Sequence, residues 1–515
     1  MKKKLLPALI VTGLIILVVI IMGITALINK YTPTKKTEDL KEYFNISSDD
    51  EAALIVDNEL SDYKAKIIDK KIYVDYKFVH DSLNSRFYWD ANENVLLYTT
   101  ASDIISAAAD SNSYSVTKQT NDFGYPIVKA TSDSALIALD YVKQYSNITF
   151  KSYDDPARIV ITSKWDEIDS ATVSKSTQVR VKGGIKSPIL KEVKKDDKIT
   201  ILDSGDKWDK IATEDGVIGY IKGKALSESK KTKLTNPDYE EETFTHIKKD
   251  KDICLAWNQV TSQSANSKVP QVISSTKGIN VMSPTWFYLN DNNGNLADIA
   301  SKDYVSYCHS QGIEVWGLFS NFENTDVDAA YVLTHTSTRT TLINQIMSAA
   351  FNYELDGVNI DFENITEAAY GDSYIEFIRE LAIKCHNNGI SLSVDVTVPA
   401  SFNKFFNRSD MANFADYIVI MGYDEHYKGS DAGSVSSIPW VTEGVESTLK
   451  EVPADQIILG MPFYTRIWEL TPKEDDDAVT DTEDQSKYTV ASQVYSMDAA
   501  AAQLATNNAT AALDE

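Results

Sequence analysis

The second half of the chain alternates short apolar runs with longer amphipathic segments, and this alternation constrains the fold more than any other feature. Seven runs have the character of strands, at residues 253–257, 279–282, 314–318, 357–362, 391–398, 417–421 and 457–461. Segments between them, such as 339–353 and 373–388, have apolar residues at helical spacing. Near-continuous apolar strands separated by helices are typical of a parallel sheet. Seven such units within about 220 residues favour a (β/α)₈ barrel over an open sheet.

The sequence offers no clear eighth strand. After Trp468 come an acidic stretch, residues 474–484, and an alanine-rich segment, residues 491–505, whose pattern predicts a helix. We therefore expect an α/β TIM barrel in a domain of residues 246–515 that lacks its eighth strand and is truncated at its C-terminal end.

One predicted strand places three polar side chains on a single face. In the run from Asp356 to Glu363, DGVNIDFE, alternate side chains share a face, so Asn359, Asp361 and Glu363 point together. Polar groups in a row on a barrel strand are costly unless they are satisfied or used. Functional groups in such barrels lie at the C-terminal strand ends, where Glu363 falls. Neighbouring carboxylates push their pKa values apart, which can keep one of them protonated near neutral pH. Glu363 is therefore the candidate general acid.

A divalent-cation site is the alternative for these acids, because carboxylates at strand ends also bind metals. No His accompanies them, and no further acidic motif is placed to complete a ligand shell. The pattern therefore favours acid–base chemistry over metal binding.

Three motifs in this half of the chain resemble those of glycoside hydrolase family 18. The run DGVNIDFE is similar to the signature Asp-Gly-x-Asp-x-Asp-x-Glu of that family. Met421-Gly-Tyr423-Asp424 ends the sixth strand, as Met-x-Tyr-Asp does in the family. The run GMPFYTRIW, residues 460–468, is similar to its Gly-x-Pro-x-Tyr segment. The resemblance extends from residue 247 to the end, about half of the chain.

The resemblance implies retaining, substrate-assisted cleavage of β-1,4-linked N-acetylglucosamine glycans without a metal or organic cofactor. Glu363 would protonate the glycosidic oxygen, Asp361 would hold the acetamido N–H, and Tyr423 would bond the acetamido oxygen. Asn359 stands where the family has Asp; its amide can still hydrogen-bond Asp361, but it cannot share a proton. Further substrate contacts are expected from Asp424, Asn359, Asp356, Trp286, Asn321, Met421 and Arg466. Trp257 is interpreted as mostly a core residue.

The N-terminus predicts export. Three lysines, residues 2–4, precede an uncharged run from Leu5 to Ile28, which would rise about 36 Å as a helix. We interpret residues 1–30 as a transmembrane signal anchor with its basic end in the cytoplasm and the rest of the chain on the cell-wall side. A cleaved signal peptide is the alternative, and it would also leave an exported protein.

Residues 31–45 and 229–245 are polar linkers that flank two further predicted domains. Residues 46–166 hold two copies of a strand–helix–hairpin pattern and resemble the α+β stalk domain first described in copper amine oxidases. Residues 170–228 alternate short strands with Gly and Asp turns, which predicts a small all-β barrel. They resemble bacterial SH3-like domains, which implies either binding of cell-wall peptides or a rigid spacer.

Composition excludes some partners of this multi-domain chain. Asp plus Glu total 75 against 50 Lys plus Arg, and this excess of acid disfavours nucleic acid. Three cysteines, at positions 254, 308 and 385, cannot pair completely and match no zinc signature. Taken with the predicted anchor and the SH3-like segment, the resemblance to family 18 implies a membrane-anchored glycosidase whose substrate is a polysaccharide, peptidoglycan above all. A secreted chitinase and an inactive carbohydrate-binding barrel are the competing functions.

Overall fold

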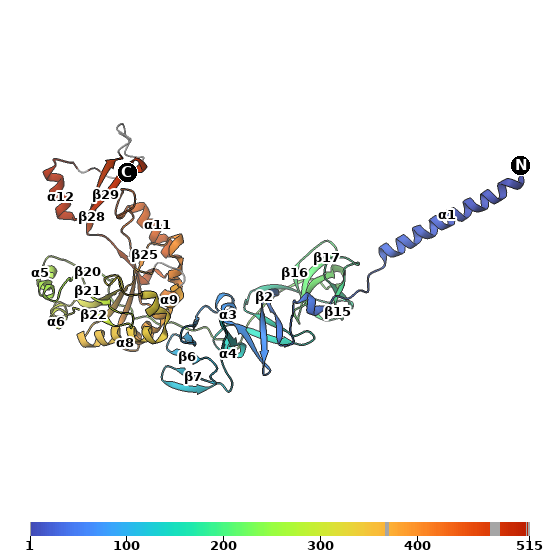
Figure 1. The fold of residues 1–515 in the computed structure, drawn as a ribbon, viewed down its shortest axis with the longest axis horizontal. Coiled ribbons are helices and arrows are strands. Elements are labelled where there is room, and N and C mark those ends of the chain that lie inside the picture. Colours follow the sequence, from blue (N-terminus) through green and yellow to red (C-terminus); the bar gives the residue numbers. More distant parts are fainter. Residues whose placement is uncertain (1, 366–369, 474–484, 511, 513–515) are drawn as a thin grey trace. The chain divides into compact units, whose positions relative to one another are not determined.

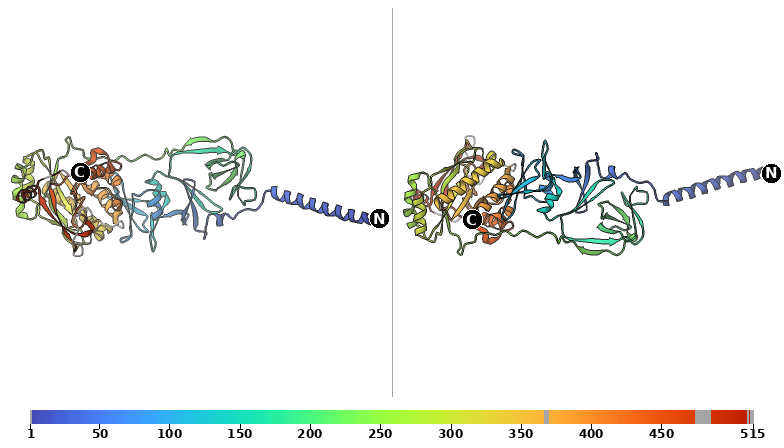
Figure 2. Two further views of the ribbon diagram at one scale, coloured as in Figure 1. Left: turned by 90° about the horizontal axis from the view of Figure 1, so that it is seen from above. Right: turned by 90° about the horizontal axis from the view of Figure 1, so that it is seen from below.

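The computed structural model describes residues 2–365, 370–473, 485–510 and 512. The chain forms two compact units that interleave in sequence, and both are traced in Figures 1 and 2. The first unit comprises Met1–Ser85, Ala109–Asn112 and Phe123–Glu241, and the second comprises Arg86–Ala108, Ser113–Asp122 and Glu242–Glu515. The segment 46–166, predicted to be one stalk domain, is thus divided between the two units.

The first unit begins with helix α1, Lys2–Tyr31. Its stretch Leu9–Tyr31 is long and apolar enough to cross a membrane, and it is the one helix of this kind among the described residues. None of that stretch is buried against the rest of the protein. A short helix α2, Leu40–Tyr43, follows, and the Asp39 side chain caps it by accepting from the Lys41 N–H.

The first unit contains two seven-stranded sheets. One has the order β11-β12-β1-β2-β3-β10-β9 and carries helices α3 (Tyr76–Ser82) and α4 (Leu139–Gln144). Its strands are β1 Glu51–Val56, β2 Glu59–Ile68, β3 Lys71–Asp75, β9 Val128–Ala130, β10 Ala135–Ala138, β11 Thr149–Tyr153 and β12 Arg158–Thr162. The other has the order β15-β14-β18-β17-β16-β13-β19. Its strands are β13 Glu167–Thr172, β14 Thr177–Arg180, β15 Ile189–Val193, β16 Lys198–Asp203, β17 Trp208–Thr213, β18 Ile218–Lys222 and β19 Lys230–Lys233.

These two sheets share a hydrophobic core. Ala53 and Ile55 of the first sheet belong to the same buried cluster as Val179 and Ile211 of the second. Arg158 of β12 also pairs with Asp215 in the β17–β18 turn, at 2.5 Å. The two segments that the sequence suggests as separate domains therefore pack as one body.

The second unit is built on a parallel sheet with the order β20-β21-β23-β24-β25-β26-β27. Its strands are β20 Leu255–Asn258, β21 Val281–Leu289, β23 Glu314–Ser320, β24 Gly357–Asp361, β25 Ser391–Thr397, β26 Tyr417–Met421 and β27 Ile457–Gly460. All seven predicted strands are present and overlap their predicted ranges. The helices that alternate with them are α5 Val269–Ser274, α6 Lys302–Ser310, α7 Ala329–Thr334, α8 Thr336–Tyr353, α9 Gly371–His386, α10 Arg408–Phe414 and α11 Ile438–Thr448.

No eighth parallel strand joins β27 among the described residues. The chain instead forms an antiparallel pair, β28 (Tyr464–Pro472) and β29 (Tyr488–Ser496), followed by helix α12 (Met497–Thr506). The helix predicted over residues 491–505 is therefore wrong in its first half, because nine cross-strand pairs hold residues 488–496 extended. The predicted acidic stretch 474–484 lies outside the described residues.

The central strand β24 alternates as its sequence predicts. Val358, Ile360 and Phe362 join the core between sheet and helices, where the Phe362 ring stacks on Phe377 of α9 with centroids 5.4 Å apart. Asn359 and Asp361 therefore face the opposite side, toward the interior of the barrel.

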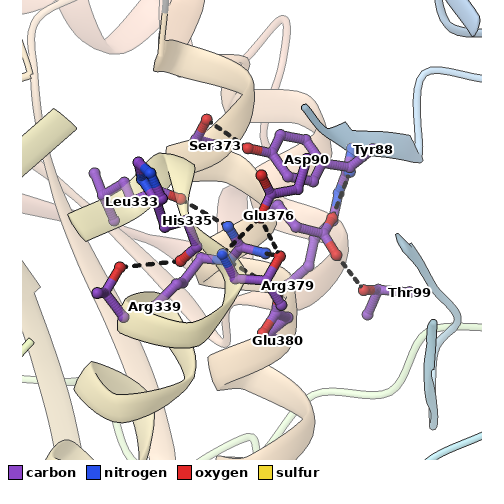
Figure 3. A network of polar contacts seen from close by, with 12 residues as sticks. Tyr88, Asp90, Thr99, Leu333, His335, Arg339, Ser373, Glu376, Arg379 and Glu380 are labelled. Carbon is purple, nitrogen blue, oxygen red and sulfur yellow. Dashed lines mark hydrogen bonds and ion pairs between the residues drawn. The ribbon is translucent and has the colours of Figure 1, made fainter. Parts of the chain in front are cut away.

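A second sheet belongs to the same unit, although its sequence lies far upstream. Strands β4 Phe87–Asp90, β5 Val95–Thr99, β6 Ile104–Ala108, β7 Ser113–Val116 and β8 Gln119–Asp122 form an antiparallel meander. Polar side chains join it to α8 and α9, as Figure 3 shows: Tyr88 bonds Ser373 at 2.8 Å, and Thr99 donates to Glu376 at 2.8 Å. Asp90 accepts from both the N–H and the hydroxyl of Thr336.

Candidate active site

A group of polar side chains gathers where β24, β25 and β26 end. Asp361 is the last residue of β24 and is 9% exposed, and Glu363 follows two positions later and is open to solvent. Tyr423 and Asp424 follow β26 directly. Because the carboxyl ends of parallel strands meet at one end of a barrel, residues distant in sequence share this cleft.

Asn359 lies two residues before Asp361 on the same face of β24 and is fully buried. Its side-chain amide forms hydrogen bonds with three neighbours. Its Oδ1 accepts from Trp257 Nε1 and from Ser283 Oγ, each at 3.0 Å. Its Nδ2 donates to Asp395 Oδ1 at 2.8 Å. The amide of Asn359 is thus used on Asp395 of β25, and not on Asp361 as its position in the motif allows.

Aromatic rings line the cleft beside these groups. The ring of Trp257 on β20 meets Tyr423 edge to face with centroids 6.2 Å apart, and Tyr423 meets Tyr464 in the same way at 6.1 Å. Gly460 lies against Trp257, since a Cβ at position 460 would be 2.9 Å from the indole ring. The glycine of the third motif thus makes room for this tryptophan. Trp257, predicted to be a core residue, instead belongs to the site.

Asp424 is held from the β28 side of the cleft. It adopts a left-handed backbone conformation with φ +59°, which Asp tolerates better than most residues. Its Oδ1 accepts from Arg466 Nη2 at 3.1 Å, and the Tyr464 hydroxyl donates to the same carboxylate. The structure therefore brings the second and third motifs into direct contact.

Asn321 and Met421 also lie at the carboxyl ends of their strands. Asn321 follows β23, is buried, and accepts from the Asn364 N–H at 3.1 Å, which ties it to the residue after Glu363. Met421 is the buried last residue of β26. Close to Asn321 lies Glu323, which accepts from Ser320 Oγ at 2.6 Å.

The electrostatics of the cleft favour protonated acids. Partial removal from water raises the pKa of Glu363, and the negative charges of Asp424 and Glu323 raise it further. Burial, followed by Asp395 and Glu363, raises the pKa of Asp361 well above its usual range. Burial raises the pKa of Asp395 to about 8, although the hydrogen bond from Asn359 opposes the shift. Burial also raises the pKa of the Tyr423 hydroxyl, so this group stays a donor.

Two of the predicted substrate contacts lie elsewhere. Trp286 is fully buried in the core, where its indole Nε1 donates to Asn266 at 2.8 Å. A bulge in the β21–β23 pairing between Thr285 and Phe287 shifts the alternation there, and the sequence pattern does not reveal it. Asp356 precedes β24 at the other end of the barrel, where it binds His309 and the Val315 N–H, each at 2.8 Å. Both predictions are corrected: Trp286 supports the core, and Asp356 fixes a loop at the amino ends of the strands.

Sequence reasoning also missed several residues of the cleft. Asp395 had a detectable signal, because in Ser391-Leu-Ser-Val-Asp-Val-Thr397 the polar residues alternate and so share its face. Trp257 and Ser283 had none, since each is recognised only through its hydrogen bond to Asn359 on another strand, and Glu323 is recognised only through the effect of its charge on Asp361 and Glu363. No group of three or more His, Cys, Asp or Glu side chains in the described part of the chain could hold a metal ion.

Residues 324–515 match the family described as Glycosyl hydrolases family 18. The barrel unit thus contains a glycoside hydrolase family 18 domain. The match includes β24 through β29, and with them Asp361, Glu363 and the Tyr423–Asp424 pair. It begins after β23, so the first three strands of the barrel unit, β20, β21 and β23, lie outside the match.

Relatives with known names support a glycosidase. An uncharacterized glycosylase of Bacillus subtilis (strain 168), YvbX, is 25% identical over 194 residues, which are 35% of this chain and 55% of the relative. A cortical fragment-lytic enzyme of the same organism is 26% identical over 187 residues, 35% of this chain and 43% of the enzyme. The chain thus spans about half the length of the curated relatives it matches. The C-terminal domain of a putative chitinase from Desulfitobacterium hafniense DCB-2 aligns with a TM-score of 0.45 at 19% identity, over 51% of this chain and 78% of that one.

Proposed function

We propose that this chain is a membrane-anchored glycoside hydrolase that cleaves β-1,4-linked N-acetylglucosamine-containing glycans, and that its substrate is peptidoglycan. The observation that carries the proposal is Glu363, a solvent-reachable acid with a raised pKa at the end of a strand whose deeper acid, Asp361, is buried. A raised pKa makes a carboxyl group a better proton reservoir, and an acid of this kind that can still reach a ligand is suited to act as a general acid.

The proposed mechanism uses the substrate itself as the nucleophile. Glu363 donates its proton to the departing glycosidic oxygen while the carbonyl oxygen of the 2-acetamido group attacks C1 and forms an oxazolinium intermediate. Asp361 accepts the acetamido N–H and stabilises the positive charge that grows there, and the Tyr423 hydroxyl donates to the acetamido oxygen. Glu363 then removes a proton from the water that opens the intermediate, so the anomeric configuration is retained.

Two further features support peptidoglycan at the cell surface. Helix α1 is suited to anchor the chain, and the lysines at its start favour a cytoplasmic N-terminus with the remaining domains outside. The resemblance of one named relative, a cortical fragment-lytic enzyme, favours a cell-wall type of glycan over chitin.

The test compares the full chain with Glu363→Gln on purified peptidoglycan and on chitin, scoring the reducing ends released. We expect the wild type to act on peptidoglycan and the variant to be roughly 10²–10⁴-fold slower, the usual contribution of general acid catalysis. Glu446→Gln, an exposed acid on α11, is the matched control and should keep wild-type activity.

Each other outcome contradicts part of the proposal. Equal product from wild type and Glu363→Gln would remove Glu363 from the mechanism, and faster release from chitin would replace the substrate. Glycan binding without product would favour a sugar-binding protein. Cleavage of a de-N-acetylated glycan at the wild-type rate would contradict the participation of the acetamido group, because that group supplies the nucleophile.

A further inference from the structure

Three buried polar atoms beneath the cleft have no hydrogen-bond partner among the described residues. They are Oδ1 of Asp361, Oδ2 of Asp395 and the hydroxyl of Tyr374. A buried polar atom without a partner costs on the order of 1–3 kcal/mol, so three of them in one place call for an explanation. All three belong to groups that interact electrostatically, since the charges of Asp395 and Asp361 both act on Tyr374.

The two carboxyl groups are neighbours across a pair of parallel strands. Strands β24 and β25 pair Asn359 with Ser393 and Ile360 with Val394. One further step in the same register sets Asp361 beside Asp395, on strands about 4.8 Å apart. Both side chains face the barrel interior, because the same face of β24 carries Asn359, which bonds Asp395 directly.

The surroundings of Asn359 determine which oxygen of Asp395 is left over. The indole N–H of Trp257 is only a donor, so the Asn359 atom that receives it is the oxygen, and the amide nitrogen is directed at Asp395 Oδ1. Asp395 Oδ2 is then the carboxyl oxygen that has no partner among the described residues. The amide of Asn359 does not titrate. Asp395 is therefore the buried neighbour with which Asp361 can share a proton.

The groups that face this pair do not supply positive charge. They are Glu363 after β24, Glu323 after β23 and Tyr423 after β26, all of them acids, together with the neutral Asn359 and Trp257. Tyr374 of α9, which packs on Phe362 in the core between sheet and helices, is a further acid on which both charges act. Two ionised carboxylates side by side in such a place would repel each other without a compensating cation. A single proton between them forms an O–H···O bond and provides both unpaired oxygens with a partner.

We propose that Asp395 is a positioning residue that shares one proton with Asp361 across β24 and β25 and thereby fixes the orientation and charge of Asp361. One oxygen of Asp361 is then held in the shared bond, and the other is available to accept the acetamido N–H of the substrate. The kinetic consequence rests on the proposed function, whereas the shared proton does not.

The first test needs no substrate. Infrared difference spectra of the full chain, wild type minus Asp395→Asn, are recorded near neutral pH in the region where a protonated carboxyl absorbs. We expect a carboxylic-acid band that is present in the wild type and lost in the variant. Absence of this band would overturn the shared proton, whatever the activity of the protein.

The second test compares two substitutions by their kinetics. Asn at position 395 can accept from Asn359 and donate to Asp361, so Asp395→Asn imitates the protonated acid, whereas Asp395→Val offers no donor. We expect Asp395→Asn to keep activity within about 10-fold and to lose the limb of the pH–rate profile at which the shared proton dissociates. Asp395→Val should lower kcat by roughly 10–100-fold, the usual effect of removing an orienting partner, with a much smaller change in KM. Equal kinetics and equal pH profiles in the two variants would contradict the proposal.

A reciprocal exchange keeps the proposal testable if the Val variant does not fold. Asn359→Asp alone places a second carboxyl 2.8 Å from Asp395 and should lower activity, while the double variant Asn359→Asp/Asp395→Asn returns one acid and one amide to the pair and should recover it. A double variant no better than the poorer single variant would count against the shared proton. A wild type that shows the infrared band but cleaves no glycan would retain this inference and refute the proposed function.

Discussion

The barrel unit buries acidic side chains in two regions, the cleft at the carboxyl ends of β24 and β25 and the contact of α8 and α9 with the β4–β8 sheet. In the second region each acid has a partner: Glu380 pairs with Arg339 at 2.9 Å, and Glu376 pairs with Arg379 at 3.0 Å while accepting from Thr99. In the cleft, by contrast, Asp361, Glu363 and Asp395 form no ion pair with any described residue. The contact of α8 and α9 with the β4–β8 sheet thus neutralises its buried charge, whereas the cleft keeps its charge unbalanced.

The difference shows how burial can serve two purposes. Paired charges join α8 to α9 and α9 to α10, and they lose most of their value if either partner is removed. Unpaired acids cost stability, but their raised pKa values make protons available near neutral pH, which acid catalysis requires. Removing a buried cation, changing the pH and deleting a single hydroxyl would separate these two roles, with effects on stability that we expect to decrease in this order.

Removing the cation from the paired region should destabilise the protein most. Arg379→Met leaves Glu376 and Asp410 buried without their guanidinium, and such a loss typically costs about 3–5 kcal/mol of unfolding free energy. Urea denaturation measures it. The control is Lys248→Met, which removes an exposed ion pair with Asp455 and should cost no more than about 1 kcal/mol. Similar losses from both substitutions would mean that the paired region carries no special share of the stability.

Stability should fall as the pH rises from about 5 to about 8, by up to about 1.4 kcal/mol per pH unit for each responsible group. The pKa of Asp395 is raised to about 8 by burial, and that of Glu380 to about 7, because Arg339 offsets part of the effect of burial. The folded protein therefore binds more protons than the unfolded chain between the ordinary carboxyl pKa, near 4, and these raised values. The contribution is complete at low pH and is lost as the pH rises through them.

Denaturation of the wild type and of Asp395→Asn at several pH values shows how much of this pH dependence of stability comes from the cleft. The variant should keep the part due to Glu380 and lose the part due to the cleft. An unchanged slope in Asp395→Asn would show that the cleft acids ionise like exposed ones, and the contrast between the two regions would disappear.

The smallest effect concerns a single hydroxyl at the contact with the upstream sheet. Tyr88→Phe deletes the buried hydrogen bond to Ser373 and should lower the unfolding free energy by about 0.5–1.5 kcal/mol. Tyr125→Phe removes an exposed hydrogen bond to Asp140 and serves as the matched control, with a smaller loss. If Tyr88→Phe is no more costly than the control, this bond does not help to hold the sheet.

Much of the barrel followed from local sequence. The seven strands were predicted because each is a short apolar run between helical segments, and the alternation of β24 was predicted because the strand repeat of two is a local property. The two hairpins predicted within residues 46–166 are present as β4–β5 and β11–β12, since turn residues between strands are recognised locally. The helix predicted at 491–505 failed in its first half because pairing with β28 overrode its alanine-rich composition.

The sequence by itself determined which residues follow the ends of the strands, and with them Asp361, Glu363 and Tyr423. Tertiary structure alone decided that Trp257 lies in the cleft while Trp286 fills the core, that Asn359 bonds Asp395, and that residues 86–108 and 113–122 belong to the barrel unit. The physical reason is the range of the interactions involved. A strand or a motif is encoded by neighbours in the chain, whereas a hydrogen bond between two strands or the burial of a ring depends on segments that meet only after folding.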